Sequence, residues 1–569
     1  MTAKLPKNIN EFMEWPWERI EPYFQELMDR EINIVNVNQY LSDWSKIDEY
    51  ITESFNRLYV RTTVDTTDKD AEQKFNYFLD EIYPNAELKN QNLKDKLLAS
   101  GLKPEGFEIP LRNMEADAEI FREKNIVLQS QDYKLSTEYD KLVGAQTVTW
   151  EGKELTIEQM KPIYQLTDRE IREKAWKLAA KRQLQDRDSY NNLWKKFLDL
   201  RIEMAHNAEF PDYRAYRWKQ LHRFDYTPAE AKQFDLAIEE VIVPIAESFY
   251  NKRKQRLGVD KLRPWDLNVD TLKREPLKPF TKADDLERKT LSIFNNVDPQ
   301  LGEYFEIMRK ENLLDLDNRK GKAPGGYCTD FTSIRRPFIF MNAVGIHDDV
   351  QTLLHEGGHA FHVFETAQLP YIQQLDVGME FAEVASMAME LLSAPYLTTG
   401  YGGFYTQDEA ARARIEHLET SLLFWPYMAV VDSFQHWVYE NPNDSRHPSN
   451  CDHKWGELWD RYMVGVDWSG IEDEKLTGWH RKLHIFQVPF YYVEYGMAQV
   501  GANQIWQNAL QDQARTVLNY RKALALGGTV SLPELYKAAG AKFKFDTVTL
   551  EQVCGLMVTT IEELEKQLD

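Results

Sequence analysis

The chain has 569 residues, 43% of them hydrophobic, and its 69 basic and 91 acidic residues give a formal net charge of −22. A surface this acidic repels phosphate backbones, which argues against nucleic-acid binding, and the hydrophobic share argues against a disordered chain. The three cysteines are too few for a disulfide framework, and no apolar run approaches the roughly 18 residues that a membrane span requires. We therefore expect a globular, cytoplasmic protein that binds neither nucleic acid nor membrane.

The N-terminal part of the chain has the pattern of long helices. Between about residues 18 and 60, apolar residues such as Ile20, Phe24 and Leu27 recur at three- and four-residue spacing. Residues 66–140 continue this pattern, with many charged residues on the opposite faces. Helices of this kind usually pack into bundles or layered lobes, so the sequence predicts a helical N-terminal region.

The spacing of apolar residues changes near residue 147. Residues 147–150 and 153–156 are two short β-type runs separated by Glu151-Gly152, which predicts a β-hairpin. Farther on, Thr167 is followed three residues later by Glu170, the spacing of a capping box. We expect a helix from there to about residue 205.

Two further segments interrupt the helical pattern. Residues 258–282 contain three prolines in a polar setting, which predicts an ordered, non-helical segment that crosses between two helical blocks. Residues 321–327 are rich in glycine and have the composition of a loop. The short apolar run at 337–342 begins with Pro337, and since proline within sheets is mostly confined to edges, we expect an edge strand there.

The motif with the clearest chemistry is His355-Glu356-Gly357-Gly358-His359. On a helix, positions i and i+4 lie on one face, so the two imidazoles can converge on one Zn²⁺. Glu356 is rotated by about 100° from His355, where it can take a proton from a water that zinc acidifies. Each mid-helix glycine costs about 1 kcal/mol relative to alanine, which indicates that something approaches this helix closely. The motif predicts His355 and His359 as zinc ligands and Glu356 as general base.

A catalytic zinc site has three protein ligands, so one more is needed. His362 lies about 60° off the line of the other two histidines, which favours a neighbour of the site over a ligand. Residues 380–390 predict a second apolar helix, with Glu383 and Glu390 on the same face. A carboxylate in such a helix is costly unless it is paired or binds metal. We expect one of the two glutamates to bind zinc and the other to orient a ligating histidine.

With this motif, followed by Glu383-Val384-Ala385-Ser386, the chain resembles the thimet oligopeptidase and oligoendopeptidase F family of zinc metallopeptidases, most of all the oligoendopeptidase F branch. The resemblance implies that Glu383 is the third ligand of one Zn²⁺ per chain, with Glu390 and His362 supporting the ligands. It also implies a mainly α fold of two helical lobes around a deep substrate channel, with a small β element beside the zinc. We accordingly divide the chain into an N-terminal helical region that forms a channel wall, 1–200, and a catalytic region, 201–569.

The same resemblance implies substrate contacts. The family has a strand beside the site that pairs with the peptide backbone, and residues 337–342 match it, so Phe340 and Asn342 are expected to bind substrate. Tyr491 is expected to contact the substrate as well. The family also stabilises the oxyanion with a C-terminal histidine and tyrosines, and the matching residues here are His484, Tyr492 and Tyr495. The division of roles among the three tyrosines stays open.

These expectations describe a zinc-dependent endopeptidase that hydrolyses internal bonds of short, unstructured peptides, with Glu356 as general base. One alternative is a zinc carboxypeptidase of the same architecture, which would need a cation such as Arg335 or Arg336 to clamp the terminal carboxylate. Another is a non-catalytic peptide-binding protein, although the complete motif argues against it. The sequence leaves open the oligomeric state, the cleavage preference and the use of Co²⁺ or Mn²⁺ in place of zinc.

Overall fold

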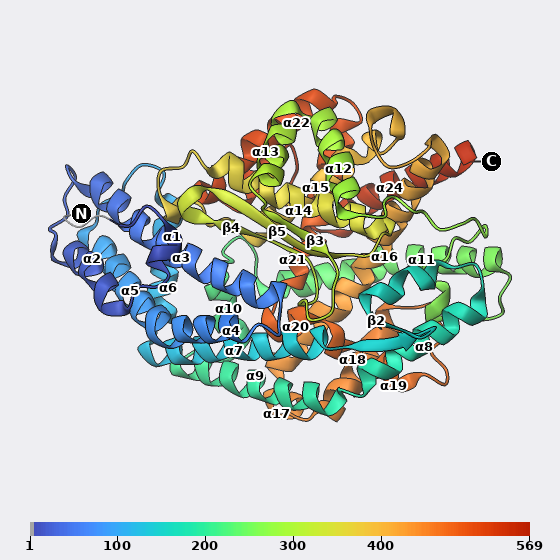
Figure 1. Ribbon diagram of the computed structural model, residues 1–569, viewed down its shortest axis with the longest axis horizontal. Coiled ribbons are helices and arrows are strands. Elements are labelled where there is room, and N and C mark those ends of the chain that lie inside the picture. The colour runs from blue at the N-terminus through green and yellow to red at the C-terminus, as the bar shows by residue number, and fades with distance from the viewer. Residues whose placement is uncertain (1–4, 569) are drawn as a thin grey trace.

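The computed structural model describes residues 5–568 and is mainly helical, with two small β-sheets, as the resemblance implied. Figure 1 shows the N-terminal helices, in blue, at one end of the molecule and the three-stranded sheet near its centre. Within the described residues, none of the helices combines the length and the apolar character that crossing a membrane requires.

The N-terminal helices build a hydrophobic core of their own. Its buried side chains run from Phe12 to Met114 and are separate from the larger core of the rest of the chain. Helix α3 (Val37–Val64) contributes to both cores, through Leu58 and Val60. The other helices here are α1 (Ile9–Phe12), α2 (Trp17–Asp29), α4 (Lys69–Tyr77), α5 (Tyr83–Ser100), α6 (Glu108–Ile120) and α7 (Glu123–Gly144). The predicted helical pattern of this region is confirmed.

The predicted hairpin is also present. Strands β1 (Thr147–Trp150) and β2 (Lys153–Thr156) pair antiparallel, and the turn residues Glu151 and Gly152 have φ values of 50° and 81°. A two-residue turn with positive φ matches the twist of the two strands.

The helical run after the hairpin differs from the prediction. Asp168, not Thr167, caps the helix, because its side chain accepts hydrogen bonds from the amides of Glu170 and Ile171. The run to residue 205 is two helices with a break at 185–186, namely α8 (Arg169–Leu184) and α9 (Arg187–Asn207).

Residues 258–282, all within the described part of the chain, cross between two helical blocks as predicted and contain only a short 3-10 turn at Pro264–Asp266. The preceding helix, α11, starts with a capping box of Thr227 and Glu230 and stops at Gly258, which adopts the left-handed conformation. The helices on both sides of this segment are α10 (Tyr213–Gln220), α11 (Pro228–Leu257), α12 (Ala283–Val297) and α13 (Pro299–Lys310).

The three-stranded sheet has the order β3–β5–β4. Strand β3 (Leu314–Asp317) is parallel and β4 (Tyr327–Phe331) antiparallel to the central β5 (Arg336–Ala343). The prediction that 337–342 is an edge strand is therefore wrong. The amide of Ile339 donates to the carbonyl of Leu313 at the start of β3. The backbone nitrogen of Pro337, two residues earlier, points to the same side of β5 as the amide of Ile339. At that position β3 has not yet begun, so the hydrogen that proline lacks is not needed for a bond between the two strands.

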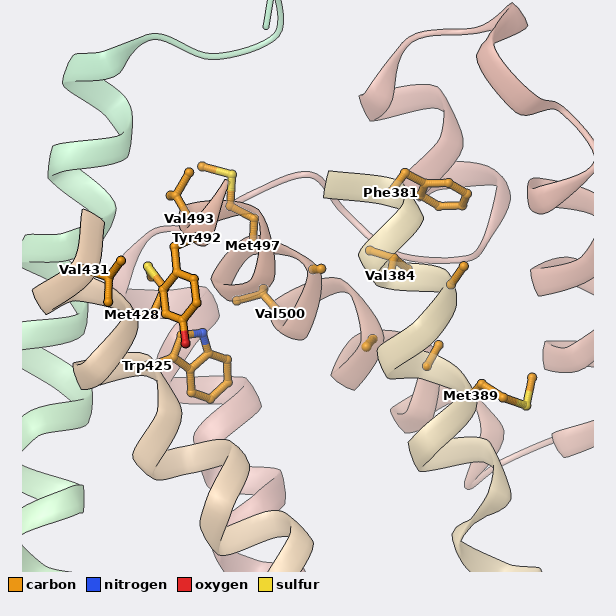
Figure 2. Close-up of a cluster of buried hydrophobic side chains, with 14 of the residues drawn as sticks. Phe381, Val384, Met389, Trp425, Met428, Val431, Tyr492, Val493, Met497 and Val500 are labelled. Atoms are coloured by element: carbon orange, nitrogen blue, oxygen red, sulfur yellow. The ribbon is translucent and has the colours of Figure 1, made fainter. Parts of the chain in front are cut away.

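The C-terminal half of the chain packs around helix α21. Figure 2 shows Met497 and Val500 of α21 in one apolar cluster with Val384 of α15 and Trp425 of α16. The indole of Trp425 donates to the carbonyl of Gly496 at 3.0 Å, which fixes α21 along its axis relative to α16. The helices are α14 (His347–Thr366), α15 (Met379–Ser393), α16 (Gln407–Glu440), α17 (Pro442–Ser445), α18 (Pro448–Tyr462), α19 (Glu472–Leu476), α20 (Leu483–Gln487), α21 (Tyr492–Ala509), α22 (Gln513–Leu524), α23 (Leu532–Ala538) and α24 (Thr547–Leu568).

A cavity of about 570 Å³, which we call the cleft, lies between the two hydrophobic cores. Phe55 and Tyr59 of α3 line one wall, and residues of α14 and α15 line the opposite wall. The two helical lobes that the resemblance implied thus enclose a cavity between them. The division of the chain at residue 200 stays a prediction.

Candidate metal centre

Helix α14 carries His355 and His359 on one face, as their spacing predicts. Its N-terminus is fixed by Asp349, whose carboxylate accepts hydrogen bonds from three backbone amides at 2.8, 2.7 and 2.9 Å, those of Val344, Gly345 and Ile346. Ile346 is the N-cap residue of α14 and the other two amides precede it, so Asp349 in the first helical turn bonds back to the segment that leads into the helix. Because β5 ends at Ala343, the connection ties the histidine helix directly to the central strand of the sheet.

Glu383 of α15 completes a group of three side chains. Its Oε2 lies 3.2 Å from Nε2 of His355 and 3.5 Å from Nε2 of His359. One ligand atom from each residue lies within 4.8 Å of the other two, and residues 5–568 contain no other such group. Two imidazole nitrogens and one carboxylate oxygen are one of the ligand sets of catalytic zinc sites, which keep a fourth position open. The three residues therefore fit the metal that the motif predicts.

Two glycines let neighbouring elements approach α14. A Cβ at Gly358 would stand 2.4 Å from the carbonyl oxygen of Ala385 and 2.5 Å from Cα of Ser386, both on α15. The helices can cross this closely only because position 358 has no side chain, and the crossing brings Glu383 to the histidines. At Gly357, a Cβ would stand 2.5 Å from Cζ of Phe294, which fills that space. The close approach predicted from the glycines is confirmed.

Glu390 holds two histidines at once. Its carboxylate accepts hydrogen bonds from Nδ1 of His355 at 2.7 Å and from Nε2 of His417 at 2.6 Å. Burial disfavours the charge on Glu390, but these hydrogen bonds outweigh burial and lower its pKa to about 2. Since Nδ1 of His355 carries the donated hydrogen, Nε2 is free to bind a metal. Sequence reasoning missed His417, which lies on α16 and reaches the site only through the fold.

Glu356 also lines the cleft. Its side chain is 5% exposed, and Oε2 has no hydrogen-bond partner among the described residues. Burial raises the pKa of Glu356 above its ordinary value, while the two motif histidines act in the opposite direction. A carboxylate with a raised pKa and a free oxygen next to a candidate metal site is suited to accept a proton and release it again.

The predicted oxyanion donors reach the site from α20 and α21. Nε2 of His484 and the hydroxyl of Tyr495 are 3.1 Å apart, and both side chains line the cleft together with His355. Between the two helices, Phe490 has a φ of 65°, which helps to turn the chain back toward the cleft. Burial and the nearby Lys482 lower the pKa of His484 to about 3, so its ring is neutral at pH 7.

The other two tyrosines are placed differently. Tyr491 lines the cleft, but its hydroxyl donates to Oε1 of Glu383 at 2.5 Å, so it holds the carboxylate in place. The hydroxyl of Tyr492 accepts a hydrogen bond from Nζ of Lys482 at 3.0 Å and lines a neighbouring cavity instead of the cleft. The fold thus separates Tyr492 from Tyr495, two residues that the sequence could not tell apart.

Phe340 and Asn342 do not line the cleft, which corrects the substrate contacts predicted for them. Phe340 is fully buried beneath the ring of Tyr327, with the ring centroids 4.8 Å apart. Asn342 donates hydrogen bonds to the backbone carbonyls of Ala323 and Gly325. The physical reason is the order of the sheet, because β4 stands on the cleft side of β5.

The strand that faces the cleft is β4, and its first residue, Tyr327, falls within the segment 321–327 that was predicted to be a loop. Residues 327–330 line the cleft, and in the described chain β4 pairs only with β5. Its Tyr, Thr and Phe residues favour a strand. The strand has only five residues and directly follows two glycines, so its sequence is too short for an alternating pattern to distinguish a strand from a loop. On the other edge of β4 the carbonyl of Asp330 accepts a hydrogen bond from Nδ2 of Asn56 at 2.8 Å. A strand edge without a partner strand can accept an extended peptide.

His362 is a neighbour of the site, as predicted. It is buried in the cleft wall, no hydrogen bond joins it to His355 or His359, and burial lowers its pKa to about 3. Of the two arginines considered as a carboxylate clamp, Arg335 lines the cleft but is ion-paired with Glu49 at 2.6 Å. Arg336 is ion-paired with Glu311 at 2.9 Å and does not line the cleft.

The chain matches known peptidases over most of its length. The sequence profile of Peptidase family M3 matches residues 163–553, more than half of the chain, and that of the Peptidase M3 N-terminal domain matches residues 11–121. An oligoendopeptidase F homolog of Mycoplasma pneumoniae is 22% identical over 420 residues, which cover 70% of this chain and 66% of that protein. Oligopeptidase PepF of Bacillus subtilis is 24% identical over 335 residues, 57% of this chain and 48% of that protein. The chain thus spans about half to two thirds of the length of these relatives.

Solved structures share the fold. The structure of PZ peptidase A with an inhibitor has a TM-score of 0.90 and 26% sequence identity, and the match covers 96% of this chain and 97% of that chain. Oligoendopeptidase-F from Enterococcus faecium has a TM-score of 0.62 and 15% identity, over 98% of this chain and 99% of that chain. The second likeness concerns the fold alone.

Proposed function

Because the chain belongs to peptidase family M3, we propose that it is a zinc-dependent endopeptidase that hydrolyses internal bonds of short peptides. The observation that carries the proposal is the convergence of His355, His359 and Glu383 in a cleft that Glu356 also lines. A metal site and a base in one enclosed cavity are the parts that metal-assisted hydrolysis requires.

His355, His359 and Glu383 would hold one Zn²⁺. Hydrogen bonds to Glu390 and from Tyr491 keep Nε2 of His355 and Oε2 of Glu383 turned toward each other. When bound, zinc supplies a Lewis acid that polarises the scissile carbonyl and makes a water acidic enough to lose a proton near neutral pH.

Glu356 moves the protons of the reaction. It takes one proton from the attacking water as the water oxygen bonds to the scissile carbon, and it delivers that proton to the amine as the C–N bond breaks. The unpartnered Oε2 and the raised pKa of Glu356 suit both steps, since a base that holds its proton too weakly or too strongly would fail in one of them.

Tyr495, positioned by His484, stabilises the charge that develops on the carbonyl oxygen. A donor of this kind contributes about 10²–10³ in rate. The ring of His484 is neutral, and Nδ1 has no partner among the described residues, so the hydrogen belongs on Nε2, which faces Tyr495. His484 then donates to the oxygen of Tyr495 and leaves the phenol hydrogen free for the substrate.

The cleft favours an extended peptide as substrate. Strand β4 offers the backbone groups of its unpaired edge, to which a peptide can add as a further strand. Arg336 is ion-paired with Glu311 and does not line the cleft, which leaves Arg335 as the one clamp considered for a terminal carboxylate. Its Nη2 is ion-paired with Glu49 while its Nη1 has no partner among the described residues, so cleavage of amidated peptides decides between the endopeptidase and the carboxypeptidase.

Mass mapping of the products from a mixed library of C-terminally amidated peptides tests the proposal. We expect internal cleavage that a chelator abolishes and added zinc restores. Glu356→Gln should lower kcat by about 10²–10⁴. Glu563→Gln, which removes an exposed carboxylate on α24, should leave kcat unchanged. Cleavage that persists in the chelator would show that the reaction does not need a metal. Loss of single residues only from peptides with a free C-terminus would support the carboxypeptidase.

A further inference from the structure

A second cavity, of about 320 Å³, adjoins the candidate metal centre between helices α14, α15, α16 and α21. We call it the side pocket. His355, His484 and Tyr495 line both the side pocket and the cleft, so the two cavities meet where the reacting bond would lie. Apart from Glu390 and His417, which hold His355 in place, the proposed mechanism uses none of the polar side chains deeper in the side pocket.

Three buried amide side chains line the side pocket with unpartnered oxygens. Oε1 of Gln351, Oε1 of Gln499 and Oδ1 of Asn503 have no hydrogen-bond partner among the described residues. The three residues are only 8%, 6% and 1% exposed. Gln351 lies one helical turn before His355, and the other two lie one and two turns after Tyr495. Because a buried carbonyl oxygen without a donor is unfavourable, these groups fit a ligand that donates hydrogen bonds.

The amide nitrogens of two of these side chains are already engaged, which leaves the oxygens for a ligand. Nδ2 of Asn503 donates to the backbone carbonyl of Gln499 at 2.8 Å. Nε2 of Gln351 lies 3.3 Å from Nε2 of His347. Burial and the nearby His417 lower the pKa of His347 to about 3, so this ring is neutral and adds no positive charge to the side pocket.

The side pocket has two carboxylates at its rim. Asp348 and Glu416, both exposed, line the pocket where it meets a third cavity of about 390 Å³, which Arg253 and Arg412 also line. Desolvation and the nearby Asp348 raise the pKa of Glu416 to about 7, and a cation bound beside it would favour its ionised form. Neither carboxylate forms an ion pair or a hydrogen bond with another described residue, and within the described chain no lysine or arginine lines the side pocket. Met387, Leu391 and Phe424 provide apolar wall between the acceptors.

We propose that the side pocket binds the lysine or arginine side chain of a substrate residue next to the scissile bond. Both side chains carry only donors, which match the three free oxygens. Their methylene stems suit the apolar wall, and their charge suits Asp348 and Glu416. The net charge of −22 also attracts basic peptides to the protein. The inference rests on the proposed function, since it assigns substrate preference to the same site.

Matched peptides test the inference on the zinc-loaded protein. The peptides are acetylated at the N-terminus, amidated at the C-terminus and differ only in one residue beside the cleaved bond, which is lysine, arginine, norleucine or glutamate. We expect kcat/KM for lysine and arginine to exceed that for norleucine by about ten-fold or more, since hydrogen bonds to a charged group are among the stronger ones. The acetyl group ensures that a terminal amine is not the group bound.

Variants locate the preference in the side pocket. Gln499→Met and Asn503→Leu keep the approximate shape but remove an acceptor, and each should lower the ratio of lysine to norleucine cleavage by about ten-fold. Gln504→Met, next along α21 and outside the side pocket, should leave that ratio unchanged.

Equal cleavage of lysine and norleucine peptides, or an unchanged ratio in both pocket variants, would overturn the inference while the proposed function stands. No cleavage of any peptide would instead overturn the proposed function. Faster cleavage of a norleucine peptide once its N-terminus is unblocked would assign the pocket to a terminal amine.

Discussion

The phenol of Tyr491 donates a 2.5 Å hydrogen bond to one oxygen of Glu383, while the other oxygen of that carboxylate faces the two motif histidines. The two ring nitrogens of His355 are arranged in the same way, because Nδ1 is bonded to Glu390 and Nε2 is available for a metal. The ligand atoms are therefore directed toward one point by contacts on their far sides.

We predict that Tyr491→Phe weakens zinc binding by about 10–100-fold, because contacts that orient a ligand typically contribute this much. The kcat of the fully zinc-loaded variant should change little. Zinc titration against a competing chelator measures the affinity. An unchanged affinity together with a lower kcat would show that Tyr491 acts on the substrate instead of on Glu383.

Tyr495→Phe should lower kcat by about 10²–10³ with little change in KM, because the phenol is expected to donate to the transition state. Tyr492→Phe is the matched control. Its hydroxyl bonds to Lys482 outside the cleft, so the same change should have a much smaller effect. Steady-state kinetics on one blocked peptide compares the two variants. A larger loss of kcat in Tyr492→Phe than in Tyr495→Phe would show that Tyr492 is the oxyanion donor.

Gly358→Ala should destabilise the protein by about 1–3 kcal/mol, the usual cost of overpacking, and should also weaken zinc binding. The added Cβ would meet the backbone of α15 at 2.4 Å, so the helix that carries Glu383 must move. Gly555→Ala in α24 meets nothing within 4 Å and should stabilise by up to about 1 kcal/mol. Urea denaturation in chelator and zinc titration separate the two effects. Unaltered zinc affinity in Gly358→Ala would show that the crossing does not set the position of Glu383.

Asp140 in the cleft wall should make stability depend on pH. It is 4% exposed, and burial raises its pKa to about 7 although Gln487 donates a hydrogen bond to it at 2.7 Å. Between about pH 4 and 7 the folded protein holds a proton that the unfolded chain releases, so the free energy of unfolding falls as pH rises through this range.

Asp140→Asn should therefore lose less stability than the native protein between pH 5 and pH 8, by a difference on the order of a few kcal/mol at most. Urea denaturation at both pH values, with chelator present throughout, measures this difference without a contribution from metal binding. The same pH dependence in both proteins would mean that Asp140 is ionised in the folded state as well.

The sequence predicts the parts of the site that depend on local spacing. Two histidines four residues apart define a helix face, and Glu383 and Glu390 define another, so the converging group follows once both helices are assigned. The mid-helix glycine at 358 even indicates the crossing that joins the helices. The hairpin at 147–156 is equally local, because Glu151-Gly152 specifies the turn.

What the sequence does not predict depends on distant contacts. Pro337 suggested an edge, but the order of three strands places its nitrogen beyond the end of β3, which no local pattern reveals. Tyr492 and Tyr495 have the same side chain, so the sequence cannot tell which one reaches the cleft. The course of α21 and the hydrogen bond from Lys482 to Tyr492 distinguish them. The side pocket joins residues from helices far apart in the chain, so no spacing in the sequence could indicate it.

The unpaired edge of β4 also bears on how this protein avoids aggregation. An exposed strand edge can pair with any other chain, and proteins usually protect it with charges, prolines or a covering helix. Here the edge lies inside the cleft, and α3 and α14 both pack against β4. The enclosure that we propose to restrict substrates to extended peptides would therefore also keep this edge from joining the edge of another molecule.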